Sequence, residues 1–298
     1  RLEAEAERLA RELGVRHLEL RQLERRHPDW PEQDLYVTFR KALLPDEEAN
    51  LLAIPRKQRA MVRKGIKNGL VSALDADLDR FFALYADNVH RHGTPALPRR
   101  YFEQLRREFG RDCEVLTVSS ADGRPVSSVL SFYFRDEVLP YYAGDAEAAR
   151  ELAANDFKYW ELMRRACARG LATFDYGRSK QGTGSFSFKK NWGFEPTPLH
   201  YEYRLYKRDA VPQNNPSNAK YRLLIETWRR LPLAVARLQR AAQAQFGHGV
   251  QKGHGRAHGK TKQPVAKGLA QGGLAGLIRA DDEVDVALAL GQLQGAFG

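Results

Sequence analysis

The chain opens with apolar residues at helical spacing among alternating charges. Leu2, Leu9 and Leu13 fall on one face of a helix with about 3.6 residues per turn, and Gly14 follows them directly. Because glycine commonly ends a helix, residues 2–14 predict an amphipathic helix that stops at Gly14.

Two stretches with alternating apolar residues follow this helix. They are VRHLELRQL (15–23) and DLYVTFRKAL (34–43), and a period of two is typical of strands. The chain starts at Arg1 and is already in a helical pattern there. We therefore expect residues 1–48 to be the C-terminal remnant of a first domain.

A longer series of elements comes next. The periodicity and the placing of glycine and proline predict helices at 55–68, 77–90, 99–110 and 146–169, and strands at 113–120, 126–136, 137–145, 171–177 and 198–206. The first three of these strands are consecutive, which predicts an antiparallel meander. The expected fold class is α+β, or mixed α/β, with a mostly antiparallel central sheet flanked by helices, and residues 49–210 form a second domain.

The end of the chain has a different character. Residues 211–245 have the pattern of a basic amphipathic helix, whereas residues 246–298 are rich in Gly, His and Lys and show no periodicity. A composition of the second kind buries too little apolar surface to fold. We expect a basic helical extension followed by a disordered tail.

Charge narrows the choice of partners. The 298 residues carry a formal net charge of +11, which favours an anionic partner: phosphate, nucleotide, nucleic acid or a membrane surface. No apolar run reaches the roughly 18 residues of a membrane span. Cys113 and Cys167 make neither a disulfide framework nor a metal cluster.

The segment 174–194, FDYGRSKQGTGSFSFKKNWGF, combines aromatic rings, glycines, a carboxylate and cations directly after a predicted strand. Ligands commonly bind beyond the carboxyl ends of strands. Asp175 is a candidate base or an orienting partner for Arg178, and Arg178 suits a phosphate or carboxylate. The further substrate-binding candidates here are Tyr176, Gly177, Ser179, Lys189, Lys190 and Trp192. A surface turn with solvated cations is the alternative.

The predicted helix 55–68 gathers its cations on one face, which holds Arg56, Arg59, Arg63 and Lys67. This face suits capture of a phosphate or polyphosphate group, and Arg59 and Arg63 are candidate substrate-binding residues. A solvated charged face explains the same pattern.

Two other places offer candidate contacts. Tyr142, near the end of a predicted strand, suits a hydrogen bond to a substrate, although aromatic packing explains it as well. Asn155 and Tyr159 lie in the predicted helix 146–169, and a helix N-terminus favours anions. No metal site is expected.

The sequence resembles the FemAB family, and within it the subgroup associated with the exosortase/PEP-CTERM system of exopolysaccharide-producing bacteria, in four blocks: LPYYAGD, NDFKYWELMRRACARG, FDYGRSKQGTGSFSFKKNWGFEPTPLHYEY and IPRKQRAMVRKGIKNGL. The resemblance implies two GNAT-like domains, of which the first is truncated here and the second, residues 49–210 with a GNAT-like sheet, is catalytic. It also implies transfer of an acyl or aminoacyl group to an amine. Some members bind tRNA with an inserted helical arm, which has no counterpart in this sequence.

Residues and resemblance together predict an acyltransferase of cell-envelope, peptidoglycan or exopolysaccharide metabolism, cytoplasmic or peripheral at the inner membrane face. Asp175, Tyr142 and Arg178 are its candidate catalytic residues. No cofactor is expected to stay tightly bound, because a coenzyme A thioester or an aminoacyl-tRNA would serve as donor co-substrate. One alternative is a non-catalytic binding protein for an anionic sugar-phosphate or polysaccharide precursor. Another is non-specific binding of nucleic acid.

Overall fold

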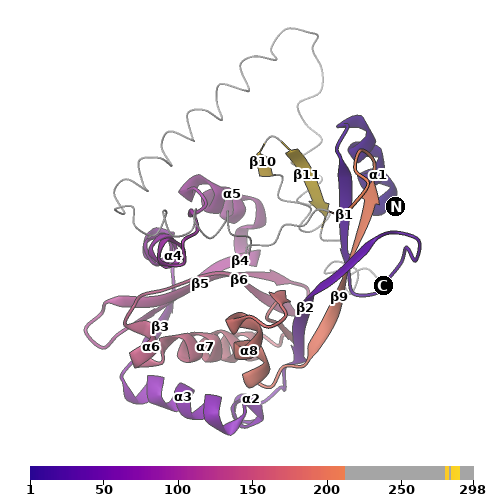
Figure 1. The fold of residues 1–298 in the computed structure, drawn as a ribbon. Coiled ribbons are helices and arrows are strands. Elements are labelled where there is room, and N and C mark those ends of the chain that lie inside the picture. Colours follow the sequence, from indigo (N-terminus) through magenta and orange to yellow (C-terminus); the bar gives the residue numbers. More distant parts are fainter. Residues whose placement is uncertain (212–278, 282, 289–298) are drawn as a thin grey trace. The chain divides into compact units, whose positions relative to one another are not determined.

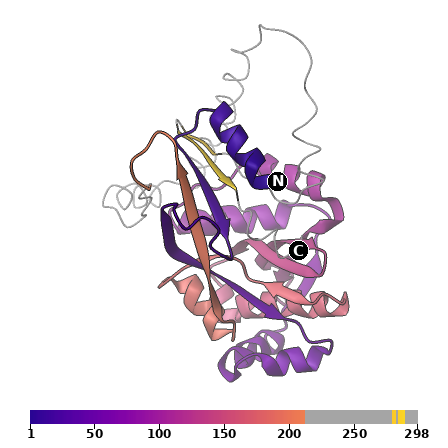
Figure 2. The same ribbon diagram turned by 90° about the vertical axis from the view of Figure 1, so that its right-hand side faces the viewer.

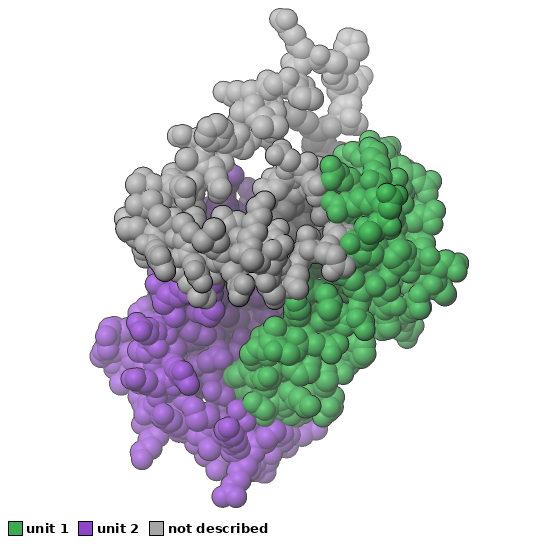
Figure 3. All heavy atoms as spheres, viewed as in Figure 1, with its two compact units in different colours: residues 1–41, 175–214, 263–298 green, residues 42–174, 215–262 purple. Residues whose placement is uncertain are grey.

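The computed structural model describes residues 1–211, 279–281 and 283–288, whose elements Figure 1 shows. The chain divides into two compact units, which Figure 3 colours separately. The first unit holds residues 1–41, 175–214 and 263–298, and the second holds residues 42–174 and 215–262.

The first unit is built on a small sheet. Its elements are α1 (Leu2–Glu12), β1 (His17–Gln22), β2 (Glu32–Ala42), β8 (Ser179–Lys180), α8 (Gly184–Asn191), β9 (Pro196–Leu205), β10 (Arg279–Asp281) and β11 (Glu283–Leu288). Strand β9 lies between β1 and β2 and is antiparallel to both, as Figure 2 shows. Strand β8 pairs with β2, and β11 runs parallel to β1.

The core of this unit follows from two periodicities. Ala6 and Ala10 lie one turn apart on α1, while Leu18 and Leu20 lie two residues apart on β1, so each pair shares a face. All four side chains are buried together with Trp30. Small alanines let the helix approach the strand closely, and the leucines fill the space between them.

A buried carboxylate fixes the connection from β1 to β2. Glu202 of β9 is fully buried and accepts a hydrogen bond from the Gln22 side chain at 2.9 Å. It also accepts bonds from the backbone N–H groups of Arg26 and His27, at 2.9 and 2.7 Å. A buried charge needs such partners, because each unmade bond would cost about 1–3 kcal/mol.

The described residues of the second unit surround a five-stranded sheet. Its elements are α2 (Glu47–Ala53), α3 (Arg56–Lys67), β3 (Val71–Leu74), α4 (Asp79–Arg91), α5 (Arg99–Phe109), the 3-10 turn Gly110–Asp112, β4 (Cys113–Ser119), β5 (Pro125–Phe134), β6 (Glu137–Asp145), α6 (Ala149–Leu152), α7 (Ala154–Ala168) and β7 (Thr173–Asp175). The strand order is β7-β6-β5-β4-β3. Strands β3 to β6 are antiparallel, and β7 is parallel to β6.

Helices cover both faces of this sheet (Figure 1). On one face, Phe102 of α5 packs edge-on against Phe81 of α4 and Tyr142 of β6, each at 5.2 Å between ring centroids. On the other face, Phe157 of α7 shares a buried cluster with Val118 of β4. Helix α3 then packs on the outside of α7.

The predicted fold class is confirmed as α+β with a mixed, mostly antiparallel sheet. The single helix predicted at 146–169 is wrong, because α6 and α7 are separate. Ala153 between them has a left-handed backbone with φ of 59°. That conformation costs about 1 kcal/mol for alanine. Burial of Ala149, Ala153 and Ala154 keeps the break in place. The strand predicted at 171–177 is shorter, at Thr173–Asp175.

The contact units divide the chain differently from the predicted domains. They change at 41/42 and 174/175, whereas the sequence boundaries fall at 48/49 and 210/211. The reason is strand pairing, since β9 completes a sheet with β1 and β2. Truncation of a first domain stays a prediction.

The predicted extension and tail, 211–245 and 246–298, lie almost wholly outside the described residues. Of the tail, the structure describes β10 and β11, which pair with each other. Among the described helices, none has the length and apolar character that crossing a bilayer requires.

Candidate functional site

The sheet of the second unit opens at strand β6. Strands β6 and β7 pair only at Glu137 with Thr173 and at Val138 with Phe174. The backbone N–H of Tyr176, two residues after Phe174, donates to the Phe39 carbonyl of β2 instead. In the described part of the chain, β6 therefore has no strand partner on this side beyond Val138. An extended ligand can pair with such an edge.

Strand β6 also bulges along this open stretch. Tyr142 is opposite Leu130 of β5, but Pro140 is opposite Ser131, so Tyr141 is an extra residue. The bulge leaves the Tyr141 side chain 43% exposed. Bulges re-aim side chains and are common beside active sites.

Tyr142, predicted from the sequence, lies next to the bulge. Its hydroxyl is 2.9 Å from the hydroxyl of Tyr101 on α5. Burial raises the pKa of Tyr101 to about 12 and raises that of Tyr142 further. Tyr142 therefore keeps its proton at neutral pH, and it suits donation of a hydrogen bond or proton better than removal of one.

An ion pair that the sequence analysis missed lies at the end of β6. Lys158 of α7 is fully buried, and its Nζ donates to Asp145 Oδ1 at 2.8 Å. The Ser127 hydroxyl donates to the same carboxylate. Burial alone would raise the pKa of Asp145, but Lys158, Ser127 and Arg91 outweigh it and hold that pKa below its ordinary value. The pair ties β6 to α7.

Helix α7 begins immediately after the left-handed Ala153. The first backbone N–H groups of a helix point outward and favour anions. Asn155 and Asp156 in this first turn are half-buried. Tyr159, one turn further on, is half-buried as well: Lys158 Nζ is 4.9 Å from its ring centroid, and burial raises its pKa.

In the first unit, Asp175 is almost fully buried. Its Oδ1 accepts the Gly177 N–H at 2.7 Å and the Thr38 hydroxyl at 3.3 Å, and Arg40 Nη1 is 3.7 Å from its Oδ2. Burial raises its pKa in spite of these partners. The sequence left two roles open for Asp175, a base or a partner of Arg178. The contacts favour holding the turn at Gly177, with Arg40 as the nearby cation.

The guanidinium group of Arg178 contacts two tyrosines, Tyr36 and Tyr201. Its guanidinium carbon is 4.4 Å from the Tyr36 ring centroid, and Nη1 donates to the Tyr201 hydroxyl at 2.9 Å. The two tyrosine rings stack at 4.8 Å. The side chain of Arg178 is held in place and exposed, as an anion-binding group requires. Tyr36 lies on β2 and Tyr201 on β9, and no local pattern in the sequence indicates that these two strands pair.

Lys189 closes the same turn. Its Nζ donates to the carbonyl groups of Gly177 and Arg178 at 3.0 and 3.1 Å. Burial lowers its pKa to about 8, against the attraction of Asp175. A lysine with this pKa is partly neutral near pH 8.

Of the other candidate residues in the segment 174–194, some are buried in the core and others lie at the surface. Trp192 is fully buried, and its ring centroid lies 6.2 Å from that of Tyr176, so it supports the fold and offers no face to a ligand. Ser179 is buried as well, while Lys190 is exposed.

The candidates of the basic helix lie on the outer side of α3. Arg59 Nη1 donates to the Leu52 carbonyl at 2.9 Å, which caps α2. Arg63 is exposed. The structure thus gives them no contact with the open edge of β6.

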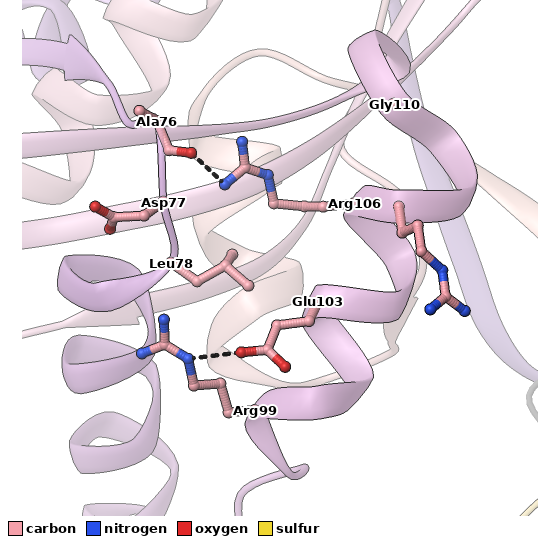
Figure 4. Close-up of a pocket in the computed structure, with 8 residues that line it drawn as sticks. Ala76, Asp77, Leu78, Arg99, Glu103, Arg106 and Gly110 are labelled. Atoms are coloured by element: carbon pink, nitrogen blue, oxygen red, sulfur yellow. Dashed lines mark hydrogen bonds and ion pairs between the residues drawn. The ribbon is translucent and has the colours of Figure 1, made fainter.

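A shallow hollow lies elsewhere on the second unit, between α5 and the start of α4 (Figure 4). Arg106 Nη1 donates to the Ala76 carbonyl at 2.9 Å, and Arg99 Nε donates to Glu103 at 2.9 Å. Because these charges satisfy one another or the backbone, we assign no chemistry to the hollow. Among the described residues, no group of three His, Cys, Asp or Glu could hold a metal ion.

The chain is similar to known proteins. Residues 54–190 match the family model of the acetyltransferase (GNAT) domain. The crystal structure of FemX is similar at 15% identity with a TM-score of 0.48, covering 68% of this chain and 68% of that one. L-PGS from Bacillus licheniformis is similar at 12% identity with a TM-score of 0.39, again covering 68% of each chain.

A tandem GNAT protein from the clavulanic acid biosynthesis pathway is similar at 16% identity with a TM-score of 0.46, covering 70% of each chain. No curated protein matches the sequence. The family match supports a GNAT-type acyltransferase domain within residues 54–190. The exosortase-associated subgroup stays a prediction.

Proposed function

We propose that this protein transfers an acyl or aminoacyl group from an activated donor to an amine. The observation that carries the proposal is the open, bulged edge of β6, which lies inside the segment that matches the GNAT model. A donor with an extended amide-bearing arm can pair with this edge as an added strand. Its phosphate groups would then meet the first turn of α7.

The chemistry needs positioning more than a nucleophilic side chain. The amine nitrogen attacks the acyl carbonyl, the bond to the leaving group breaks, the amine loses a proton and the leaving group gains one. Holding both reactants in line supplies much of the rate. Tyr142, which stays protonated, is our candidate to donate a proton or hydrogen bond to the leaving atom.

The 175–190 segment of the first unit is considered by itself, as a candidate anion-binding surface. Arg178 would bind an anionic group there, and Asp175 and Lys189 would hold the turn that carries it. An envelope or exopolysaccharide precursor fits this charge, and the resemblance to FemAB proteins supports it. Whether the donor is a coenzyme A thioester or an aminoacyl-tRNA is decided by experiment.

The test combines binding with turnover. The full chain is incubated with acetyl-coenzyme A or aminoacyl-tRNA and a panel of amines, and release of the free carrier is followed. Bound donor should raise the melting temperature. Tyr142→Phe should keep that shift while losing kcat by about 10²-fold or more. Turnover unchanged in Tyr142→Phe would remove Tyr142 from the mechanism, and no turnover with any donor would contradict the transferase.

The second candidate function is binding without turnover. Arg178 on its two tyrosines favours it, because aromatic rings and a fixed guanidinium suit a sugar phosphate. A melting shift with nucleotide- or lipid-linked sugars, lost in Arg178→Ala and accompanied by no transfer with any donor, would establish this alternative.

A further inference from the structure

Helix α3 carries a surface that the proposed function does not use. Between Glu48 and Asp75 the sequence has no acidic residue and no aromatic one. Five exposed cations of α3 make up what we call the cationic stripe: Arg56, Lys57, Arg63, Lys64 and Lys67. In the part of the chain that the structure describes, none of these five has an ion-pair partner.

The stripe faces away from the core. Val62 and Gly65 are the buried residues of α3. A Cβ added at Gly65 would lie 2.8 Å from Phe157 Cβ, so this side packs tightly on α7. At about 100° per residue, the cations of the stripe fall within a sector roughly opposite Val62 and Gly65.

Apolar side chains border the stripe on one side. Ile66 of α3 is 52% exposed, and Leu52 near the end of α2 is 55% exposed. Arg59 links them, because it projects from the same edge of α3 as Ile66 and donates to the Leu52 carbonyl. The exposed aliphatic side chains of Leu52 and Ile66 therefore lie next to the cationic stripe.

We propose that this face of α2 and α3 docks on an anionic phospholipid surface. Lysines and arginines near such a surface are attracted by its negative potential, and exposed aliphatic side chains can enter the boundary between headgroups and acyl chains. Nucleic acid is the less suitable anion, because single strands are bound by stacking on aromatic rings and this segment has none. The inference does not depend on the proposed transferase activity.

The test is co-sedimentation of the full chain with vesicles. Vesicles of phosphatidylcholine plus phosphatidylglycerol should bind the protein, vesicles of phosphatidylcholine alone should not, and added salt should release it. Replacing Lys57, Lys64 and Lys67 with Gln should weaken binding on the order of 100-fold. The matched control replaces Arg100, Arg107 and Arg111 with Gln, which removes the same charge elsewhere and should leave binding nearly unchanged.

A second variant tests the apolar border. Leu52→Ser with Ile66→Ser keeps the charge and should weaken vesicle binding several-fold, while circular dichroism confirms the fold. Equal losses in the stripe variant and its control would reduce the effect to net charge and overturn the proposal. Binding of single-stranded RNA, lost in the stripe variant and unaccompanied by vesicle binding, would also overturn it.

Discussion

Two lysines, Lys158 and Lys189, form contacts that hold parts of the candidate site in place. Lys158 is fully buried in α7 and reaches Asp145 at the end of β6. Lys189 is held by two carbonyl groups next to Asp175. In both cases one amine contacts a neighbouring segment of the chain. The role of each amine can therefore be tested by replacing a single side chain.

Lys158→Met should destabilise the second unit. It leaves the Asp145 carboxylate without its cation, and breaking a buried pair costs about 3–5 kcal/mol. Because Asp145 is 29% exposed, we expect about 2–4 kcal/mol in urea unfolding. Lys57→Met on the outside of α3 is the control and should cost little. A double variant with Asp145→Asn should lose less than the sum of the single changes.

Acid should weaken the same interaction. The folded-state pKa of Asp145 is lowered, so its contribution is present above the unfolded value of about 3.9 and is lost as the pH falls through the folded pKa. The stability difference between the parent protein and Lys158→Met should therefore shrink below about pH 4. A difference that stays constant with pH would show that the lysine acts by packing alone.

Lys189 should titrate far below an ordinary lysine. Burial lowers its pKa to about 8. Reductive methylation with labelled formaldehyde gives each lysine a signal whose shift reports its charge, and the Lys189 signal should titrate near pH 8. Its loss in Lys189→Arg assigns it. A midpoint at the ordinary lysine value would mean that the amine is hydrated in solution.

At the scale of elements, α4 approaches β6 closely at Gly144. A Cβ at Gly144 would lie 2.5 Å from the backbone carbon of Leu84 and would also meet the Tyr85 nitrogen. Neither backbone atom can move without shifting the helix, so Gly144→Ala should destabilise by about 1–3 kcal/mol or more. Gly184→Ala at the start of α8 meets nothing within 4 Å and is the control. Equal melting temperatures for both variants would contradict this packing.

The helices and strands also show which parts of the fold can be predicted from sequence patterns. The strands of the meander and helices α4 and α5 were predicted closely, because their apolar residues repeat with the right period. The break at Ala153 was not, since alanine favours helix and nothing local marks a left-handed residue. Lys158 was missed for a similar reason. A lysine on a helix is expected in water, and only packing against β6 reveals that it is buried.

For the whole molecule, the sequence did not predict which strands distant along the chain pair with each other. Strand β9 completes the sheet of β1 and β2, and this joins residues 175–205 to the first unit. Period-two alternation identifies a strand but not its neighbour. The candidate block 174–194 was singled out by its composition, whereas its contacts with Tyr36, Thr38 and Arg40 depend on that pairing.

The second unit should fold as an isolated fragment of residues 42–174. All five strands of its sheet and the helices on both faces come from this one stretch, apart from the last residue of β7. Its contacts are therefore mostly local in sequence, which favours independent folding. We expect dispersed amide signals in NMR and a cooperative thermal transition. The shorter fragment 42–148 lacks α6, α7 and β7 and should fail both measurements, because Val118 and Phe157 could no longer form their buried cluster. If 42–174 stayed unfolded at neutral pH while the full chain melted cooperatively, the first unit would be an obligatory part of the GNAT-like fold. The effect of any variant in β1, β2 or β9 would then have to be interpreted as an effect on that fold as well.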